Sequence, residues 1–150
     1  MVKTLIVYQS YHHGNTKKIA EAMAEELEAN VLKPEEVDLD DIDSYDLIGF
    51  GSGIYAFRHH KDILDLVAAL PEAHGKKAFV LSTSGSGKNS FNKDLSTKLS
   101  EIGYEVIGDF ACKGFNTVGP FGIVGGVSKG RPDENDLEEA RDFARKLKHQ

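Results

Sequence analysis

The chain has 150 residues, of which 40% are hydrophobic and 28% are charged, and its formal net charge at pH 7 is -6. This length and composition suit one domain with a hydrophobic core, so we expect residues 1–150 to form a single domain. The negative charge argues against a nucleic-acid partner, because phosphate binding requires a basic surface.

The cysteine content and the first apolar run indicate the compartment. Cys112 is the only cysteine, which excludes an internal disulfide framework and fits a reducing environment. Residues 4–8 are too few for a signal peptide or a membrane span. We therefore expect a cytoplasmic protein with no membrane partner.

Short apolar runs alternate with segments of helical spacing along the chain. The runs typical of buried parallel strands are, in chain order, residues 4–8, 31–39, 46–50, 78–81 and 106–110. The second run contains Pro34, which cannot donate to a strand ladder, so we expect this strand at an edge of the sheet. The βαβ succession predicts a doubly wound α/β domain, a five-stranded parallel sheet with helices on both faces.

Four helices are predicted between and after these strands. Three of them are marked by apolar stripes, and the fourth is the segment over residues 61–70, which ends before Pro71. The stripes are Ile19, Met23 and Leu27 in the first helix, Leu95, Leu99 and Ile102 in the third, and Leu137, Ala140, Phe143, Ala144 and Leu147 in the last. The last helix is the best marked, because Pro132 and Asp133 open it and Asp136 stands three residues on as a capping partner.

The loop after the first strand is polar and runs directly into a helix. Backbone N–H groups and the positive end of a helix dipole make such a turn an anion site, and we expect it to bind a phosphate group. The alternative is a helix cap, since Asn and Thr are favoured there, but capping accounts for only one of these residues. The candidate binding residues are Ser10, His12, His13, Gly14, Asn15 and Thr16.

The loop after the third strand combines glycines with aromatic residues. Its candidates are Ser52, Gly53, Ile54, Tyr55 and Phe57. The glycines imitate a dinucleotide fingerprint, but they follow the third strand and lack the required acidic residue. We expect the backbone to approach a flat ring there, with an aromatic side chain covering the ring face. The alternative is that the apolar residues only plug the end of the core.

The loop after the fourth strand is rich in serine and glycine. Gly87 and Lys88 suggest a phosphate-binding Walker motif, but Ser82 stands where that motif requires glycine and Asn89 follows the lysine. The candidate residues for cofactor binding in this loop are Thr83, Ser84, Gly85 and Gly87.

The first loop resembles the FMN-phosphate loop of flavodoxins. The resemblance rests on residues 7–10, on Gly14-Asn15-Thr16 and on Ile19-Ala20, with a spacer at residues 11–13 that is about one residue longer than is common. It implies the strand order 2-1-3-4-5 and an FMN whose phosphate lies in the first loop. It also implies that the ring lies between the second and third loops, with Tyr55 as the first choice for stacking.

The same resemblance implies a low-potential electron carrier that uses FMN to shuttle electrons between redox proteins. No general base or nucleophile is evident, which favours a non-catalytic carrier over an enzyme. One alternative is an NAD(P)H-dependent FMN or quinone reductase of the same fold, with a nicotinamide pocket supplied by residues 113–130. Another is a protein-interaction module that has lost FMN. The intact polar first loop argues against that module.

The sequence also leads to expectations about partner proteins, metal binding and the cysteine. The partners would be a donor reductase or ferredoxin-type protein and an unknown acceptor, with the chain a monomer or weak homodimer. The acidic run over residues 35–43 is either a solvated surface or a docking surface for a basic redox partner. Adjacent histidines rarely ligate one ion, so we expect no metal site at His12-His13 or His59-His60. We expect Cys112 to be a small buried residue.

Overall fold

The fold is that of a parallel sheet with helices on both faces, seen in a computed structural model that describes residues 2–10, 14–55, 57–114 and 130–149. The sheet has the order β2-β1-β3-β5-β6. Its parallel strands are β1 (Thr4–Gln9), β2 (Asn30–Leu32), β3 (Leu47–Tyr55), β5 (Lys77–Ser84) and β6 (Glu105–Lys113). The order 2-1-3-4-5 implied by the sequence is thereby confirmed.

Several details of the sheet differ from the sequence prediction. β3, β5 and β6 run past the predicted ends at residues 50, 81 and 110, so Ser52–Tyr55 and Thr83–Ser84, which were expected in loops, lie at the ends of strands. A sixth strand, β4 (Arg58–His59), pairs antiparallel with the end of β3; two residues carry no alternation from which it could be predicted. The predicted strand over residues 31–39 is shorter, because Pro34 begins the 3-10 helix η1 (Pro34–Glu36). β2 is an edge strand, as the proline indicated.

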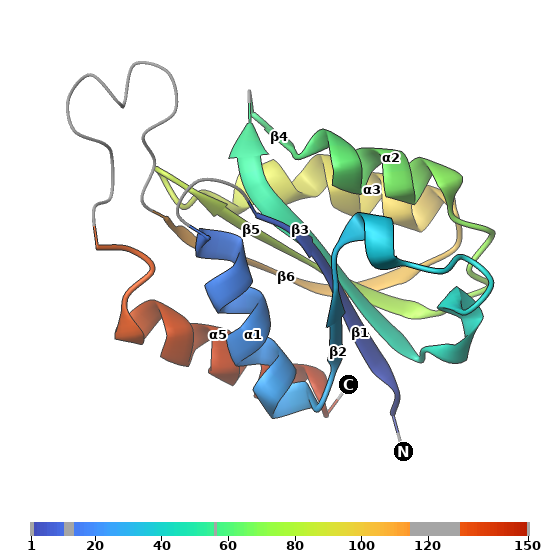
Figure 1. Cartoon of the computed structure of the whole chain (residues 1–150), viewed down its shortest axis with the longest axis horizontal. Helices are drawn as coiled ribbons and strands as arrows, with labels where there is room; N and C mark the ends of the chain where they lie inside the picture. Colours follow the sequence, from blue (N-terminus) through green and yellow to red (C-terminus); the bar gives the residue numbers. More distant parts are fainter. Residues whose placement is uncertain (1, 11–13, 56, 115–129, 150) are drawn as a thin grey trace.

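In the part of the chain that the structure describes, the α-helices form two pairs (Figure 1). Helices α1 (Asn15–Leu27) and α5 (Glu134–Leu147) cover one face of the sheet, and α2 (Lys61–Ala69) and α3 (Lys93–Glu101) cover the other. The short helices η2 (Ile42–Ser44) and η3 (Asn89–Asn92) lie before β3 and before α3. The predicted cap of α5 is confirmed, since Asp133 is its N-cap and exchanges hydrogen bonds with Asp136.

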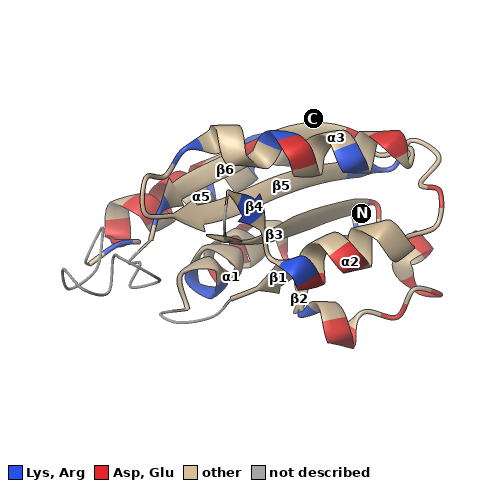
Figure 2. Cartoon of the chain, turned by 90° about the horizontal axis from the view of Figure 1, so that it is seen from above, with Lys and Arg blue, Asp and Glu red and all other residues tan. Residues whose placement is uncertain are grey.

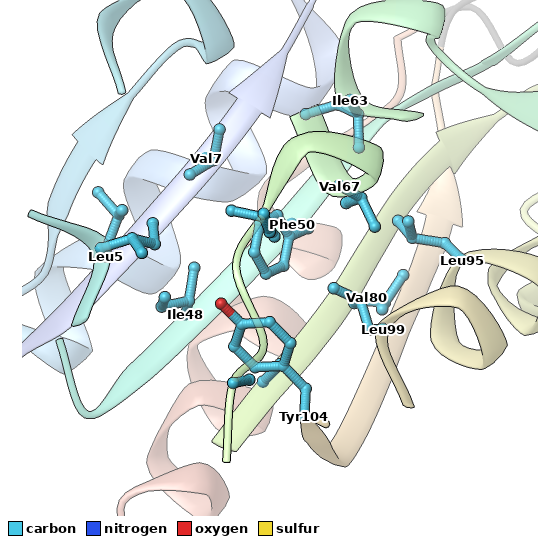
Figure 3. Packing of buried hydrophobic residues seen from close by; sticks show 14 residues of the cluster. Leu5, Val7, Ile48, Phe50, Ile63, Val67, Val80, Leu95, Leu99 and Tyr104 are labelled. Atoms are coloured by element: carbon cyan, nitrogen blue, oxygen red, sulfur yellow. The ribbon is translucent and has the colours of Figure 1, made fainter. Parts of the chain in front are cut away.

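Alternation along each strand separates two hydrophobic clusters. On β1, Leu5 and Val7 face α2 and α3, whereas Ile6 and Tyr8 face α1 and α5. Figure 3 shows the first cluster, in which Phe50 packs edge-on against Tyr104 with ring centroids 6.0 Å apart. Burying both faces in this way explains why the strand sequences are almost continuously apolar.

A close approach in the sheet requires a glycine. A Cβ atom on Gly49 would lie 2.2 Å from the ring of Phe79, its register partner on β5. The ring of Phe79 therefore occupies the space that a side chain at residue 49 would need.

Among the described residues, none of the helices has both the length and the apolar character that crossing a bilayer requires.

Candidate functional site

Three loops leave the sheet at the same end, where the parallel strands have their carboxyl ends. Gln9 on β1 pairs with Ser52 on β3, and Ser52 pairs with Ser82 on β5, so the strands reach this end level with one another. The loops after β1, β3 and β5 therefore begin side by side, at the top of Figure 1. Open α/β sheets bind their ligands at the carboxyl ends of the strands.

The first turn of α1 has the features of an anion site. Its N-cap is Gly14, held in the left-handed region at φ 66°, and its carbonyl oxygen accepts a bond of 3.2 Å from the amide of Lys18. The first turn carries no acidic residue. Because Gly14 has no side chain, the alternative that Asn15 or Thr16 caps this helix is wrong. The turn leaves backbone N–H groups at the positive end of the helix dipole.

Thr16 joins the first loop to the third. Its hydroxyl oxygen lies 2.9 Å from that of Thr83, and both residues are almost completely buried. The two threonines were predicted in separate loops, and the structure brings them into direct contact. Ser10, at the end of β1, donates its amide to the side-chain oxygen of Gln9 at 3.2 Å.

Hydrogen bonds within the third loop and from the residue after β6 hold this loop in place. The amide of Gly87 donates to the hydroxyl of Ser84 at 2.8 Å, and the amide of Gly114 donates to the carbonyl of Ser84 at 2.9 Å. A Cβ atom on Gly87, which has φ +67°, would lie 2.9 Å from Lys113 Cγ. Gly85, between Ser84 and Gly87, is half-buried.

Gly114 is a site residue that the sequence analysis did not select. A Cβ atom on it would lie 2.6 Å from the amide nitrogen of the Asn15 side chain. The end of β6 therefore packs directly against the start of α1. The one available signal was a glycine a few residues after the strand predicted over residues 106–110, and that signal is too common to single out a residue.

The second loop folds back on β3. The hydroxyl of Ser52 donates to the carbonyl of Gly53 at 2.6 Å and accepts from the amide of His60 at 2.8 Å. The ring of Tyr55 meets the imidazole of His60 edge-on, with centroids 5.3 Å apart. Its hydroxyl lies 3.2 Å from where a Cβ atom on Gly53 would be, so Tyr55 covers that glycine.

Phe57 lies at the tip of the same loop, while Ile54 pairs with His59 in the short ladder between β3 and β4. The Phe57 side chain is 82% exposed, and its ring centroid is 6.2 Å from that of Phe91. The alternative that Phe57 plugs the end of the core is therefore wrong. Phe57 and Phe91 connect the tip of the second loop with η3, which follows the third loop.

His59 is the other residue that the sequence analysis undervalued. It lies in β4, is 4% exposed, and its Nε2 atom is 3.0 Å from the carbonyl oxygen of Leu81 on β5. Burial lowers the pKa of His59 to about 4, so the ring is neutral at physiological pH. His60 is the N-cap of α2: its Nδ1 accepts from the amide of Asp62 at 2.9 Å.

Two further predictions concern the histidines of the first loop and the cysteine at the end of β6. His12 and His13 lie outside the described residues. Cys112 is buried as expected, and burial raises the pKa of its thiol to about 12, which leaves it protonated.

Comparisons with known proteins agree with this geometry. A family model described as a flavodoxin domain matches residues 5–112. An uncharacterized protein of Methanocaldococcus jannaschii is 45% identical over 148 residues, covering 97% of this chain and 98% of its own.

Two solved structures have the same fold. A flavodoxin from the domain Archaea superposes with a TM-score of 0.72 at 20% identity, covering 98% of this chain and 96% of its own. Flavodoxin 2 from Bacillus cereus superposes with a TM-score of 0.68 at 21% identity, covering 98% of each chain. Since the family model spans most of the sequence and the fold agrees, the chain belongs to the flavodoxin family.

Proposed function

We propose that this protein is a low-potential electron carrier that binds FMN and shuttles electrons between redox proteins in the cytoplasm. The observation that carries the proposal is the meeting of the first and third loops through Thr16 and Thr83 at a helix start without acidic residues. FMN is the cofactor expected of this family, and it would supply one- and two-electron transfer at this end of the sheet.

The first loop fits the phosphate group. Ser10, Gly14, Asn15 and Thr16 stand at the N-terminal end of α1, where backbone N–H groups and hydroxyls offer donors to an anion. Thr16 is already hydrogen-bonded and buried, so its hydroxyl is held in position before any ligand arrives. We assign these four residues to the phosphate end, with His12 and His13 as additional candidates.

The second and third loops fit a flat ring. Gly53 and Gly85 are half-buried where β3 and β5 end, and the side chains of Ser52 and Ser84 are hydrogen-bonded to backbone groups nearby. Tyr55 and Phe57 supply aromatic surface beside them. We assign these residues to the ring, where they would orient it and exclude water from its faces. They are Ser52, Gly53, Ile54, Tyr55 and Phe57 from the second loop and Thr83, Ser84, Gly85 and Gly87 from the third.

The surface beside the site favours a basic partner. A hollow of about 490 Å³ next to the end of β1 is lined by Gln9, Pro34, Glu35, Asp62, Asp65 and Leu66. Figure 2 shows Asp and Glu on α2 and on the segment after β2. A donor reductase or ferredoxin-type protein with a basic face would be attracted there, and its association rate would fall as salt is added.

Ligand titration tests the binding proposal. Protein freed of ligand is titrated with FMN and with riboflavin, which lacks the phosphate, while flavin fluorescence is followed. We expect tight FMN binding, weaker riboflavin binding, and a larger loss for FMN than for riboflavin in Thr16→Val. Thr4→Val is the matched control, since Thr4 is also buried but lies at the other end of β1. Absence of FMN binding by the wild-type protein contradicts the proposal.

Reductive titration tests the role as a carrier. Two separated one-electron steps at low potential support electron carriage between proteins. A single two-electron step, together with rapid NAD(P)H oxidation by a quinone in the absence of another protein, would instead identify a reductase.

A further inference from the structure

We propose that His59 is a positioning residue that fastens the second loop to β5 and thereby fixes the space between the second and third loops. The inference rests on the proposed FMN function, because that space is where the ring would lie.

The second loop ends in a short hairpin. Ile54 pairs with His59 and Tyr55 pairs with Arg58, so residues 56 and 57 are all that separates the paired positions. Phe57 has φ 68°, as tight hairpin turns demand. The placement of the hairpin therefore depends on what holds β4.

The imidazole of His59 holds β4 to β5. A carbonyl oxygen can only accept, so the 3.0 Å contact means that Nε2 carries the proton and donates to Leu81. Leu81 lies two residues before Thr83, on the strand that leads into the third loop. One hydrogen bond therefore connects the segments that carry the two ring-binding loops.

The ring remains in its neutral form over the physiological range. Its burial disfavours the imidazolium, and this effect exceeds the opposing influence of the Leu81 carbonyl and of Asp94. The donor is therefore constant between pH 6 and pH 8, as a positioning contact requires.

Other contacts of this hairpin lead to different elements. The amide of His60 donates to Ser52, which belongs to β3 itself, and the Nδ1 atom of His60 accepts from Asp62 in α2. Phe57 touches Phe91 beyond the third loop through an apolar contact. Among these contacts, the His59 bond is the directional one that reaches β5.

Three variants test the inference. His59→Leu removes the donor, and His59→Gln keeps an N–H near the position of Nε2. Val67→Ala, outside the hairpin, weakens the hydrophobic cluster between the sheet and helices α2 and α3. Each is titrated with FMN and with riboflavin, and the visible circular dichroism of bound flavin is recorded.

We expect His59→Leu to weaken FMN and riboflavin by the same factor, about tenfold, because a hydrogen bond at the ring end is lost. The dichroism spectrum should change as well. His59→Gln should stay within about threefold of wild type, and Val67→Ala should keep wild-type affinity. Wild-type affinity in His59→Leu overturns the inference. So does a loss in His59→Leu that Val67→Ala reproduces, or one that His59→Gln does not rescue.

Amide hydrogen exchange in the ligand-free protein separates this inference from the proposed function. Faster exchange of residues 54–60 in His59→Leu, but not in His59→Gln or Val67→Ala, supports the positioning of the hairpin even if wild type binds neither flavin. Unchanged exchange in His59→Leu overturns it even if wild type binds FMN.

Discussion

The side-chain hydroxyls of Thr16 and Thr83 are 2.9 Å apart although 67 residues separate them in the chain. Thr16 is 1% exposed and Thr83 is 3% exposed, so neither hydroxyl has ready access to bulk water. One hydroxyl donates to the other, and each would lose a partner if the other were removed. The start of α1 and the end of β5 are therefore energetically coupled.

A double-mutant cycle measures this coupling. We expect Thr16→Val and Thr83→Val each to lower the free energy of unfolding by about 1–2 kcal/mol, because each leaves a buried hydroxyl unpaired. The double variant should lower the free energy of unfolding by less than the sum of the two single effects, since it leaves no hydroxyl unpaired. Denaturant unfolding of the four proteins gives the cycle, and Thr4→Val gives the effect of Thr→Val at a buried site outside it. Additive single effects would show that the hydroxyls do not depend on each other.

Gly114→Ala should disturb the phosphate end of the site. The added Cβ would lie 2.6 Å from the amide nitrogen of Asn15, so the side chain or the start of α1 must move. We expect a loss of stability of about 1–3 kcal/mol, as for overpacking elsewhere, and weaker FMN binding. Gly108→Ala, also on β6, places its Cβ 3.2 Å from Phe143 in α5 and serves as control. Equal FMN affinities in the two variants would contradict a specific role for Gly114.

The order of the sheet was implied by the resemblance of the first loop to flavodoxins, whereas the alternation of strand and helix patterns was sufficient for the parallel α/β class. Runs such as residues 4–8 alternate between two buried faces, and a βαβ succession leaves few topologies for them. The cap formed by Asp133 and Asp136 was equally predictable, because its signal lies within four residues. Local and periodic features of this kind are present in the sequence itself.

The contacts across the site could not be predicted in the same way. Asn15 meets Gly114, and His59 meets Leu81, because of the register of β3, β5 and β6 and the way α1 is placed over them. No local pattern encodes such a meeting. The hairpin with β4 was missed for the related reason that two strand residues are too few to show a period.

The start of α5 offers a test of local stability. Asp136 is 3% exposed, accepts from the amide of Asp133 and pairs with Arg131, which lowers its pKa. We expect Asp136→Ala to cost about 2–3 kcal/mol, since it removes a capping partner and strands a guanidinium hydrogen bond, whereas exposed Glu134→Ala should cost less than about 0.5 kcal/mol. Thermal unfolding measures both. Similar losses in the two variants would show that neither the cap contact nor the ion pair of Asp136 stabilises the fold measurably.

His59 should make stability depend on pH between about 5 and 7. Its pKa in the fold is about 4, below the model-peptide value of 6.5, so the unfolded chain takes up a proton in this interval and the folded chain does not. The contribution of neutral His59 is therefore complete above about pH 6.5 and decreases as the pH falls toward 4. Linkage gives a loss of about 2 kcal/mol between pH 7 and pH 5.

Urea unfolding at pH 7, 6 and 5 measures this dependence, with His59→Gln as the control that cannot titrate. The difference in stability between wild type and His59→Gln should shrink by about 2 kcal/mol over the interval. The series stops at pH 5 because Asp94 and Asp136, whose pKa values are lowered by hydrogen bonds from Lys98 and Arg131, titrate at lower pH. Parallel pH profiles for the two proteins would mean that the imidazole accepts its proton in the folded state. The bond to Leu81 would then not require the neutral ring, because the imidazolium can also donate to a carbonyl.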